Sequence, residues 1–160
     1  MNAAELIVKH WYQNKGYFTM ESVRLARNKE LDLVLVKLSE DGKKIVDKIH
    51  VEVQVANNFV NFGTPAEQMA KEYHQKKYIS VKPAVEELLG TDYRMVEVRG
   101  KMALGSKDIR DEYIKLRKNM DVEVIPFETI LKDVQNDMLT NIQSDPVIQA
   151  IQLVKFQCAE

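Results

Sequence analysis

The chain has 160 residues, 45% of them hydrophobic and 29% charged, with a formal net charge of -1; this is typical of one globular domain and excludes a disordered chain. Its single cysteine, Cys158, excludes an internal disulfide framework and a multi-cysteine zinc or iron–sulfur site. No apolar run is long enough to span a membrane and the N-terminus lacks a signal-peptide pattern, so we expect a soluble, cytoplasmic protein.

The first half of the chain predicts one helix followed by three strands. Asn2 is a suitable cap for the helix, and Gly16 is a suitable stop. The second strand is almost continuously apolar and is therefore expected to be buried, and Asp41-Gly42 marks a turn into the third. The expected elements are a helix over 3–13 and strands over 17–25, 31–38 and 49–56.

The second half alternates helices with two further strands. Thr64 is a suitable cap for one helix, and Pro83 and Gly90 suit the first turn and the end of the next. The expected elements are helices over 66–77, 84–89 and 107–120, strands over 93–98 and 122–127, and an extension of the first of these strands over 102–104. This order predicts an α/β fold with a mixed central sheet flanked by helices. We expect a core over 1–127 and a C-terminal helical extension over 128–160, packed on the core or at a homodimer interface.

Two acidic residues lie inside apolar strands. Asp32 follows Leu31 in the second strand, and Glu52 precedes Val53 in the third. A carboxylate in such a run is costly unless its charge is compensated, and Mg²⁺ is the obvious compensating cation because it prefers oxygen ligands. If the two strands pair in a suitable register, Asp32 lies beside Glu52, and the Val53 carbonyl is a further ligand. The other interpretation is that both acids lie at strand ends or face solvent.

The features around these acids follow one another in a recognisable order. In chain order they are a first helix with Glu5, the pair Gly16-Tyr17, the triplet Glu30-Leu31-Asp32, and a hairpin into Val51-Glu52-Val53-Gln54. This order resembles the PD-(D/E)XK nuclease superfamily over about residues 3–78, and more loosely as far as Phe127. The resemblance implies a restriction-endonuclease-like fold and a nuclease that hydrolyses DNA phosphodiester bonds with Mg²⁺ or Mn²⁺.

The resemblance also assigns roles to individual residues. It implies that Asp32, Glu52 and the Val53 carbonyl bind the metal, and that Glu5 supports the metal site from the first helix. Without the resemblance, Glu5 forms an ordinary surface pair with Lys9, four positions later.

Gln54 departs from the family, which usually has lysine at this position. An amide cannot supply the positive charge that lysine offers to the nucleophile or the transition state, although Gln54 would still position the attacking water. A lysine from the following helix would then take over, and the candidates are Lys71, Lys76 and Lys77.

Several basic residues are candidates for contacts with DNA phosphates. They are Arg24, Arg27, Lys71, Lys76 and Lys77. Tyr73 and Tyr78 lie on the same helix as the lysines and suit packing against bases or sugars. The near-neutral total charge is compatible with DNA binding, because acids around a metal and a basic rim cancel in the sum. The same residues are also common on an ordinary solvated helix or turn.

Three functions follow from these patterns. The first is a metal-dependent nuclease. The second is a catalytically inactive protein with the nuclease fold, serving as a DNA-binding or protein-assembly module, and Gln54 favours it. The third is an interaction protein whose apolar tail packs on the sheet or on a second copy. His50 is expected at the sheet edge rather than as a catalytic base, and His74 is expected to face solvent.

Overall fold

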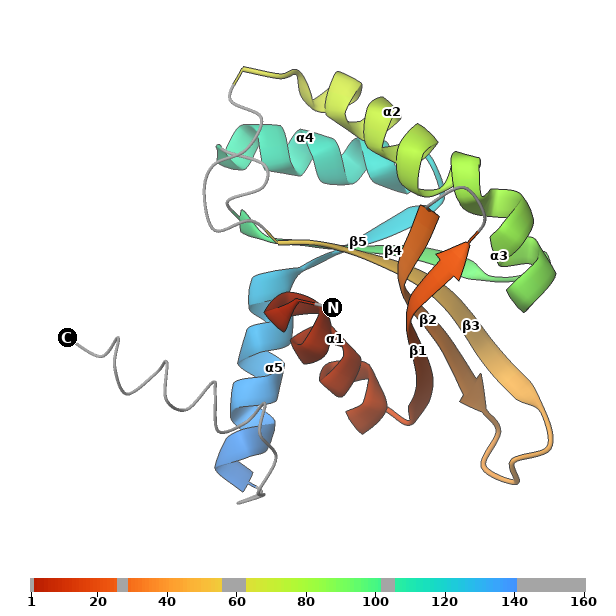
Figure 1. The fold of residues 1–160 in the computed structure, drawn as a ribbon. Helices are drawn as coiled ribbons and strands as arrows, with labels where there is room; N and C mark the ends of the chain where they lie inside the picture. Colours follow the sequence, from red (N-terminus) through yellow and green to blue (C-terminus); the bar gives the residue numbers. More distant parts are fainter. Residues whose placement is uncertain (1, 26–28, 56–62, 102–105, 141–160) are drawn as a thin grey trace.

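The computed structural model describes residues 2–25, 29–55, 63–101 and 106–140. Within these ranges, five strands form one mixed sheet in the order β1-β2-β3-β4-β5, with helices on both faces (Figure 1). The predicted α/β class, with a mixed central sheet flanked by helices, is confirmed. None of the helices in this part of the chain has the length and apolar character needed to cross a membrane.

The helices and strands follow the predicted order, and their ends differ from the prediction by a few residues. The strands are β1 (Tyr17–Leu25), β2 (Lys29–Leu38), β3 (Ile45–Gln54), β4 (Arg94–Arg99) and β5 (Val122–Pro126). The helices are α1 (Ala3–Asn14), α2 (Ala66–Lys77), α3 (Lys82–Leu89), α4 (Lys107–Lys118) and α5 (Phe127–Thr140), with a 3-10 turn η2 (Ile79–Val81) after α2. The predicted strand extension over 102–104 lies outside the described residues.

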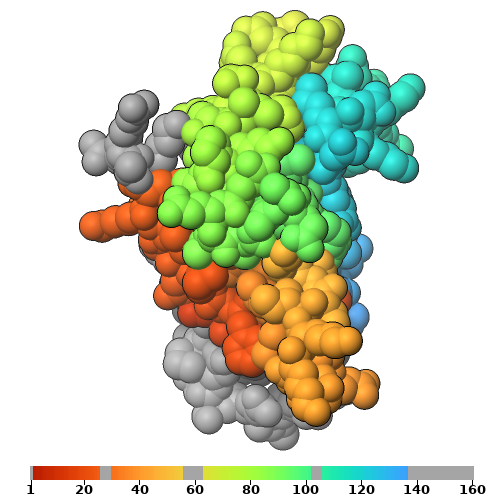
Figure 2. Space-filling view, turned by 90° about the vertical axis from the view of Figure 1, so that its right-hand side faces the viewer, coloured from red at the N-terminus to blue at the C-terminus, as the bar shows by residue number. Residues whose placement is uncertain are grey.

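The sheet combines an antiparallel and a parallel half. Strands β1, β2 and β3 form an antiparallel meander, and its second turn uses Gly42 at a φ of 69°. Strand β4 then pairs with β3 in parallel, and β5 pairs with β4 in parallel, each after a helical connection. Parallel neighbours need such crossovers, because a tight hairpin reverses the chain. The crossovers place α2, α3 and α4 on one face of the sheet (Figures 1 and 2).

Each face of the sheet has its own core. Helices α1 and α5 cover one face, where Trp11, Ile130 and Val134 pack on apolar side chains of β2, β3 and β4. The described part of the predicted C-terminal extension therefore lies against α1, whereas residues 141–160 lie outside the described residues. On the other face, Met69 and Ala70 of α2 pack against Tyr113 of α4.

The ends of the helices test the predicted caps. Asn2 and Glu5 form a reciprocal capping box at the start of α1, and Gly90 ends α3 at a φ of 79°. The prediction that Thr64 caps α2 is wrong, because Pro65 occupies the cap position and no side chain bonds there. A proline ring holds φ near the value that a helix start needs, so α2 begins without a polar cap.

Candidate metal site

The strand register brings the two acids together. Strands β2 and β3 pair Leu33 with Val51, and one further step along both strands leads to Asp32 and Glu52. Asp32 Oδ2 accepts a hydrogen bond from the Val53 N–H at 2.8 Å, where the paired part of β2 and β3 has ended. A strand residue directs its N–H and C=O to the same neighbour, so the Val53 carbonyl faces the Asp32 side of β3.

Glu52 is fully buried and has a partner on each carboxylate oxygen. His50 Nε2 lies 2.9 Å from Oε1, and Lys77 Nζ lies 2.5 Å from Oε2. The prediction that His50 lies at the sheet edge is wrong, because β4 pairs with β3 on one side and β2 on the other, which leaves His50 1% exposed. Its pairing with Glu52 holds that carboxylate in place.

Of the three candidate lysines, Lys77 is the one that reaches the acids. It is the last residue of α2, and its Nζ also lies 3.8 Å from Asp32 Oδ1. Lys71 points elsewhere and pairs with Glu67 at 2.6 Å one turn away, and Lys76 is exposed. Successive helix residues differ by about 100° in direction, so neighbouring lysines cannot all face one site.

The charges at this site affect one another. Burial and the negative charge of Glu52 raise the pKa of Asp32 to about 7. Burial lowers the pKa of Lys77, but the charges of Glu52 and Asp32 outweigh it, so the pKa rises above its usual value. With both acids ionised, two carboxylates face one ammonium, and the site has one negative charge in excess.

The donor chemistry of this site fits a hard divalent cation. Two carboxylates and a backbone carbonyl are oxygen donors of the kind that Mg²⁺ takes, usually together with several waters. Burial is the main cause of the raised pKa of Asp32 and the charge of Glu52 is the second, and a bound cation would compensate that negative charge. Among the described residues, no group of three or more His, Cys, Asp or Glu side chains is arranged to hold a metal. A cation here would therefore depend on Asp32, Glu52, the Val53 carbonyl and water.

Gln54, at the end of β3, faces an open cavity beside these acids. The volume of this cavity is about 380 Å³. The lining residues are Gln54, Thr64, Gln68, Met69, Glu72, Tyr73, Lys76, Lys77 and Arg99. Lys77 thus borders both the acids and this cavity, and a ligand in the cavity would lie next to the candidate metal site.

The side chain of Glu5 accepts hydrogen bonds that cap α1, and its influence on the candidate metal site is electrostatic. Its Oε2 accepts from the Asn2 N–H at 3.0 Å, and its Oε1 accepts from Asn2 Nδ2 at 2.5 Å. Its negative charge is among the influences that raise the pKa values of Asp32 and Lys77. Lys9, the alternative partner considered from the sequence, binds Glu21 at 2.5 Å.

Three other predicted residues that the structure describes are Arg24, Tyr78 and His74. Arg24 is exposed on β1, and Arg27 lies outside the described residues. Tyr78 is buried and donates its hydroxyl to the Val96 carbonyl at 2.8 Å, so it is part of the core and cannot stack on a base. The prediction that His74 faces solvent is wrong, because its ring stacks on Tyr78, its Nδ1 is buried, and burial lowers its pKa.

A buried cluster on β4 and α4 was missed from the sequence. Glu97 is fully buried and bonds Arg117 Nε at 2.8 Å, and it also contacts Arg99 Nε. The Tyr113 hydroxyl donates to Glu97 Oε1 at 2.9 Å and accepts from Arg99 Nη2 at 3.0 Å. The sequence does contain a sign of this cluster, because Glu97 and Arg99 interrupt an apolar strand in the same way as Asp32 and Glu52.

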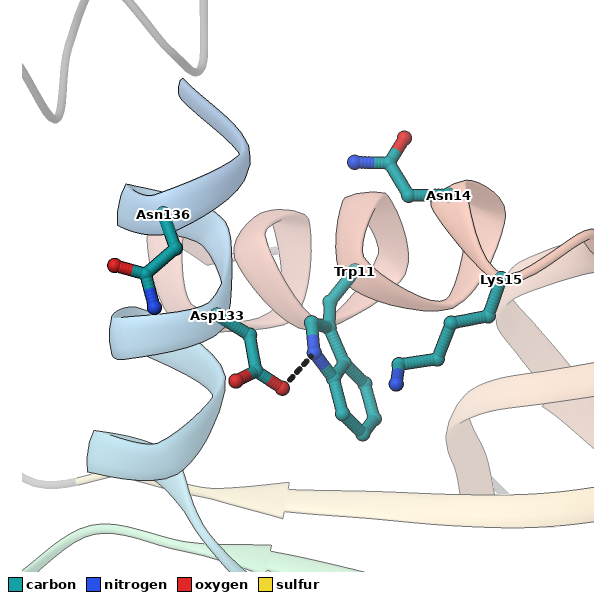
Figure 3. A pocket seen from close by; sticks show the side chains of 5 residues that line it. All are labelled: Trp11, Asn14, Lys15, Asp133 and Asn136. Carbon is teal, nitrogen blue, oxygen red and sulfur yellow. Dashed lines mark hydrogen bonds between the residues drawn. The ribbon is translucent and has the colours of Figure 1, made fainter. Parts of the chain in front are cut away.

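A smaller cavity of about 280 Å³ lies between α1 and α5, on the opposite face of the sheet. Trp11 Nε1 donates to Asp133 Oδ2 at 2.9 Å, and Lys15 Nζ lies 4.2 Å from the centre of the Trp11 ring (Figure 3). Asn14 and Asn136 complete the lining. These contacts join α5 to α1, and the sheet separates them from Asp32 and Glu52.

Comparisons with known proteins name no activity for this chain. No family model matches the chain, and no curated protein shows significant similarity to it. A crystal structure of a protein of unknown function is similar, with 13% sequence identity and a TM-score of 0.48, over 87% of this chain and 78% of that chain.

Proposed function

We propose that this protein is a metal-dependent nuclease with a restriction-endonuclease-like core, which hydrolyses phosphodiester bonds in DNA. The observation that carries the proposal is the meeting of Asp32, Glu52 and Lys77, which come from β2, β3 and α2. Two acids at neighbouring strand ends with an ammonium beside them match the arrangement that the resemblance implies. Lys77 supplies the positive charge that Gln54 lacks.

Each residue has a distinct role in this proposal. Asp32, Glu52 and the Val53 carbonyl hold Mg²⁺ or Mn²⁺, which when bound lowers the pKa of a water and stabilises charge on the phosphate. Lys77 places its positive charge beside the attacked phosphate, because its ammonium lies at the border between the acids and the cavity. Gln54 faces the same cavity and orients the attacking water through its amide.

A cleavage assay tests the proposal. Supercoiled, linear and branched DNA are incubated with Mg²⁺ or Mn²⁺, and nicks and strand breaks are followed on gels. Asp32→Asn is expected to abolish cleavage, while the matched control Asp111→Asn, an exposed acid on α4, retains it. Equal cleavage by wild type and Asp32→Asn would contradict the proposal.

One observation favours the second candidate function, a catalytically inactive module with the nuclease fold. The Lys77 ammonium already compensates Glu52 at 2.5 Å, so the buried acid has a counter-charge without any metal. Such a protein would bind its partner without metal-dependent cleavage and without stabilisation by Mn²⁺.

A further inference from the structure

The cluster on β4 and α4 buries more positive than negative charge. Arg99 and Arg117 share the single carboxylate of Glu97, and Arg117 and Glu97 are fully buried. A guanidinium stays protonated in proteins, so one positive charge is in excess. The tyrosine rings around it compensate only in part: the Arg99 guanidinium lies 4.6 Å from the centres of the Tyr73 and Tyr113 rings. A buried excess charge is costly unless it is paired.

This basic cluster lies directly beside the acidic one. The parallel register of β3 and β4 pairs Glu52 with Glu97 and Gln54 with Arg99. Neighbouring strands lie about 4.8 Å apart, so the excess negative charge at Asp32 and Glu52 adjoins the excess positive charge at Arg99 and Arg117. The two excess charges therefore compensate each other in part, and an anion at the basic cluster would additionally pair the donors that no described residue satisfies.

The unsatisfied groups in the basic cluster are hydrogen-bond donors. Arg117 Nη2 and the Tyr73 hydroxyl are buried and have no hydrogen-bond partner among the described residues. Burial raises the pKa of Tyr73 well above its usual value, so the hydroxyl keeps its proton. Arg99, 5% exposed, lines the cavity together with Tyr73 and Lys76. A ligand in the cavity that satisfies the donors of Arg99, Tyr73 and Lys76 must offer several acceptor oxygens and negative charge.

We propose that this cavity is a phosphate-binding site, in which Arg99, Lys76 and Tyr73 hold a phosphate group of a nucleic acid strand beside the metal-binding acids. The assignment to a nucleic acid strand rests on the nuclease function proposed above, whereas the affinity for phosphate rests on the charges and donors of the cavity alone. Arginine recognises phosphate through two parallel hydrogen bonds, and Glu97 and the aromatic rings hold the Arg99 guanidinium in position for this. The phosphate is either a terminal monoester or an internal diester.

Binding without metal tests this site separately from catalysis. Fluorescence anisotropy is measured in EDTA and low salt with a short single-stranded DNA labelled at its 3′ end, carrying a 5′-phosphate or a 5′-hydroxyl. Inorganic phosphate serves as competitor. The test variants are Arg99→Gln and Lys76→Met. The matched controls are Arg94→Gln, at the other end of β4, and Lys115→Met, an exposed lysine on α4.

We expect each test variant to weaken DNA binding by about tenfold or more, the loss that corresponds to one hydrogen bond to a charged group, and each control to change it by less than about twofold. Tighter binding of the 5′-phosphate strand assigns a terminal monoester, and equal binding of both strands, with the same loss in the variants, assigns an internal diester. Test variants that bind as well as the controls overturn the proposal.

Two further measurements keep the outcomes separate. If circular dichroism shows that Arg99→Gln is unfolded, Lys76→Met and Tyr73→Phe test the site in its place. Both should fold, because Lys76 is exposed and Tyr73→Phe removes only a hydroxyl. Cleavage with Mn²⁺ is measured on the same preparations. Phosphate binding that depends on Lys76 and Arg99 in a protein that does not cleave supports this site and contradicts the nuclease. Cleavage by the wild type, together with test variants that bind DNA as tightly as the wild type, supports the nuclease and contradicts the phosphate-binding site.

Discussion

The Lys77 ammonium lies 2.5 Å from Glu52 Oε2, and this pair joins the last turn of α2 to the middle strand of the sheet. The carboxylate is fully buried, whereas the lysine side chain is 25% exposed and borders the cavity. Lys77 is therefore accessible to a ligand while Glu52 holds it in position. Because of this geometry, replacing Lys77 is the most direct test of whether the site is catalytic.

Replacing Lys77 by methionine is expected to slow DNA cleavage by about 100-fold or more, the usual cost of losing one group that stabilises transition-state charge. A Lys77→Met/Gln54→Lys double variant is expected to recover part of the rate, because residue 54 faces the same cavity. Rates are measured by plasmid nicking, with Lys82→Met, an exposed lysine on α3, as the control. Equal rates for the Lys77 and Lys82 variants would show that Lys77 has no part in the chemistry.

Asp32→Asn is expected to change how stability depends on pH in metal-free buffer. The pKa of Asp32 is 3.8 in the unfolded reference and about 7 in the folded protein, so the folded state binds more protons between these values. Its contribution to the free energy of unfolding is therefore lost as pH rises through this window. Asparagine lacks this effect, so the variant should gain roughly 2 to 4 kcal/mol relative to wild type between pH 4 and pH 8.

Urea denaturation at several pH values in EDTA measures this difference between Asp32→Asn and wild type. Asn keeps an oxygen that can accept from the Val53 N–H, so the local hydrogen bond is preserved. A difference between variant and wild type that does not change with pH would mean that the Asp32 pKa is not raised.

Mn²⁺ is expected to stabilise the wild-type protein, by about 1.4 kcal/mol at a concentration ten times its Kd. Thermal melting with and without millimolar Mn²⁺ measures the effect. Glu52→Gln should abolish it, because one of the two carboxylates is lost, whereas Glu72→Gln, an exposed acid that faces the same cavity, should retain it. Absence of stabilisation in the wild type would favour the catalytically inactive module.

Two substitutions of Glu5 separate its capping role from its charge. Glu5→Gln can keep the capping box but loses the negative charge, and Glu5→Ala loses both. We expect Glu5→Ala to lower the free energy of unfolding by about 1 kcal/mol and Glu5→Gln to leave it nearly unchanged. Cleavage should fall in both variants if the charge of Glu5 supports the metal site, and a decrease confined to Glu5→Ala would limit Glu5 to capping.

His50→Ala is expected to destabilise the protein by about 3 kcal/mol, since it leaves a cavity and removes a partner of the buried Glu52 carboxylate. Urea denaturation measures the loss. His10→Ala, on the partly exposed part of α1, is the control and should cost less than about 1 kcal/mol. Similar losses at both positions would mean that the His50–Glu52 pair contributes little to stability.

Local patterns predicted the elements well because each depends on residues that are near in the chain. Alternation and apolar runs located the five strands, Asn2 marked the start of α1, and Asp41-Gly42 marked the hairpin between β2 and β3. Thr64 failed as a cap because Pro65 took the cap position without a side-chain bond. The burial of His50 could not be predicted, because it depends on β4, which follows β3 only after α2, η2 and α3.

The position of Asp32 and Glu52 within apolar strands follows from the residues on either side of each acid, because a strand pattern is local. Which lysine joins the two acids depends on how the helices pack on the sheet. Lys71, Lys76 and Lys77 are alike in sequence, and the packing of Met69 and Ala70 against Tyr113 sets which face of α2 turns toward the sheet. The same packing encloses Arg99 and Arg117 around Glu97, because their contacts span α2, β4 and α4 and arise only when these elements meet.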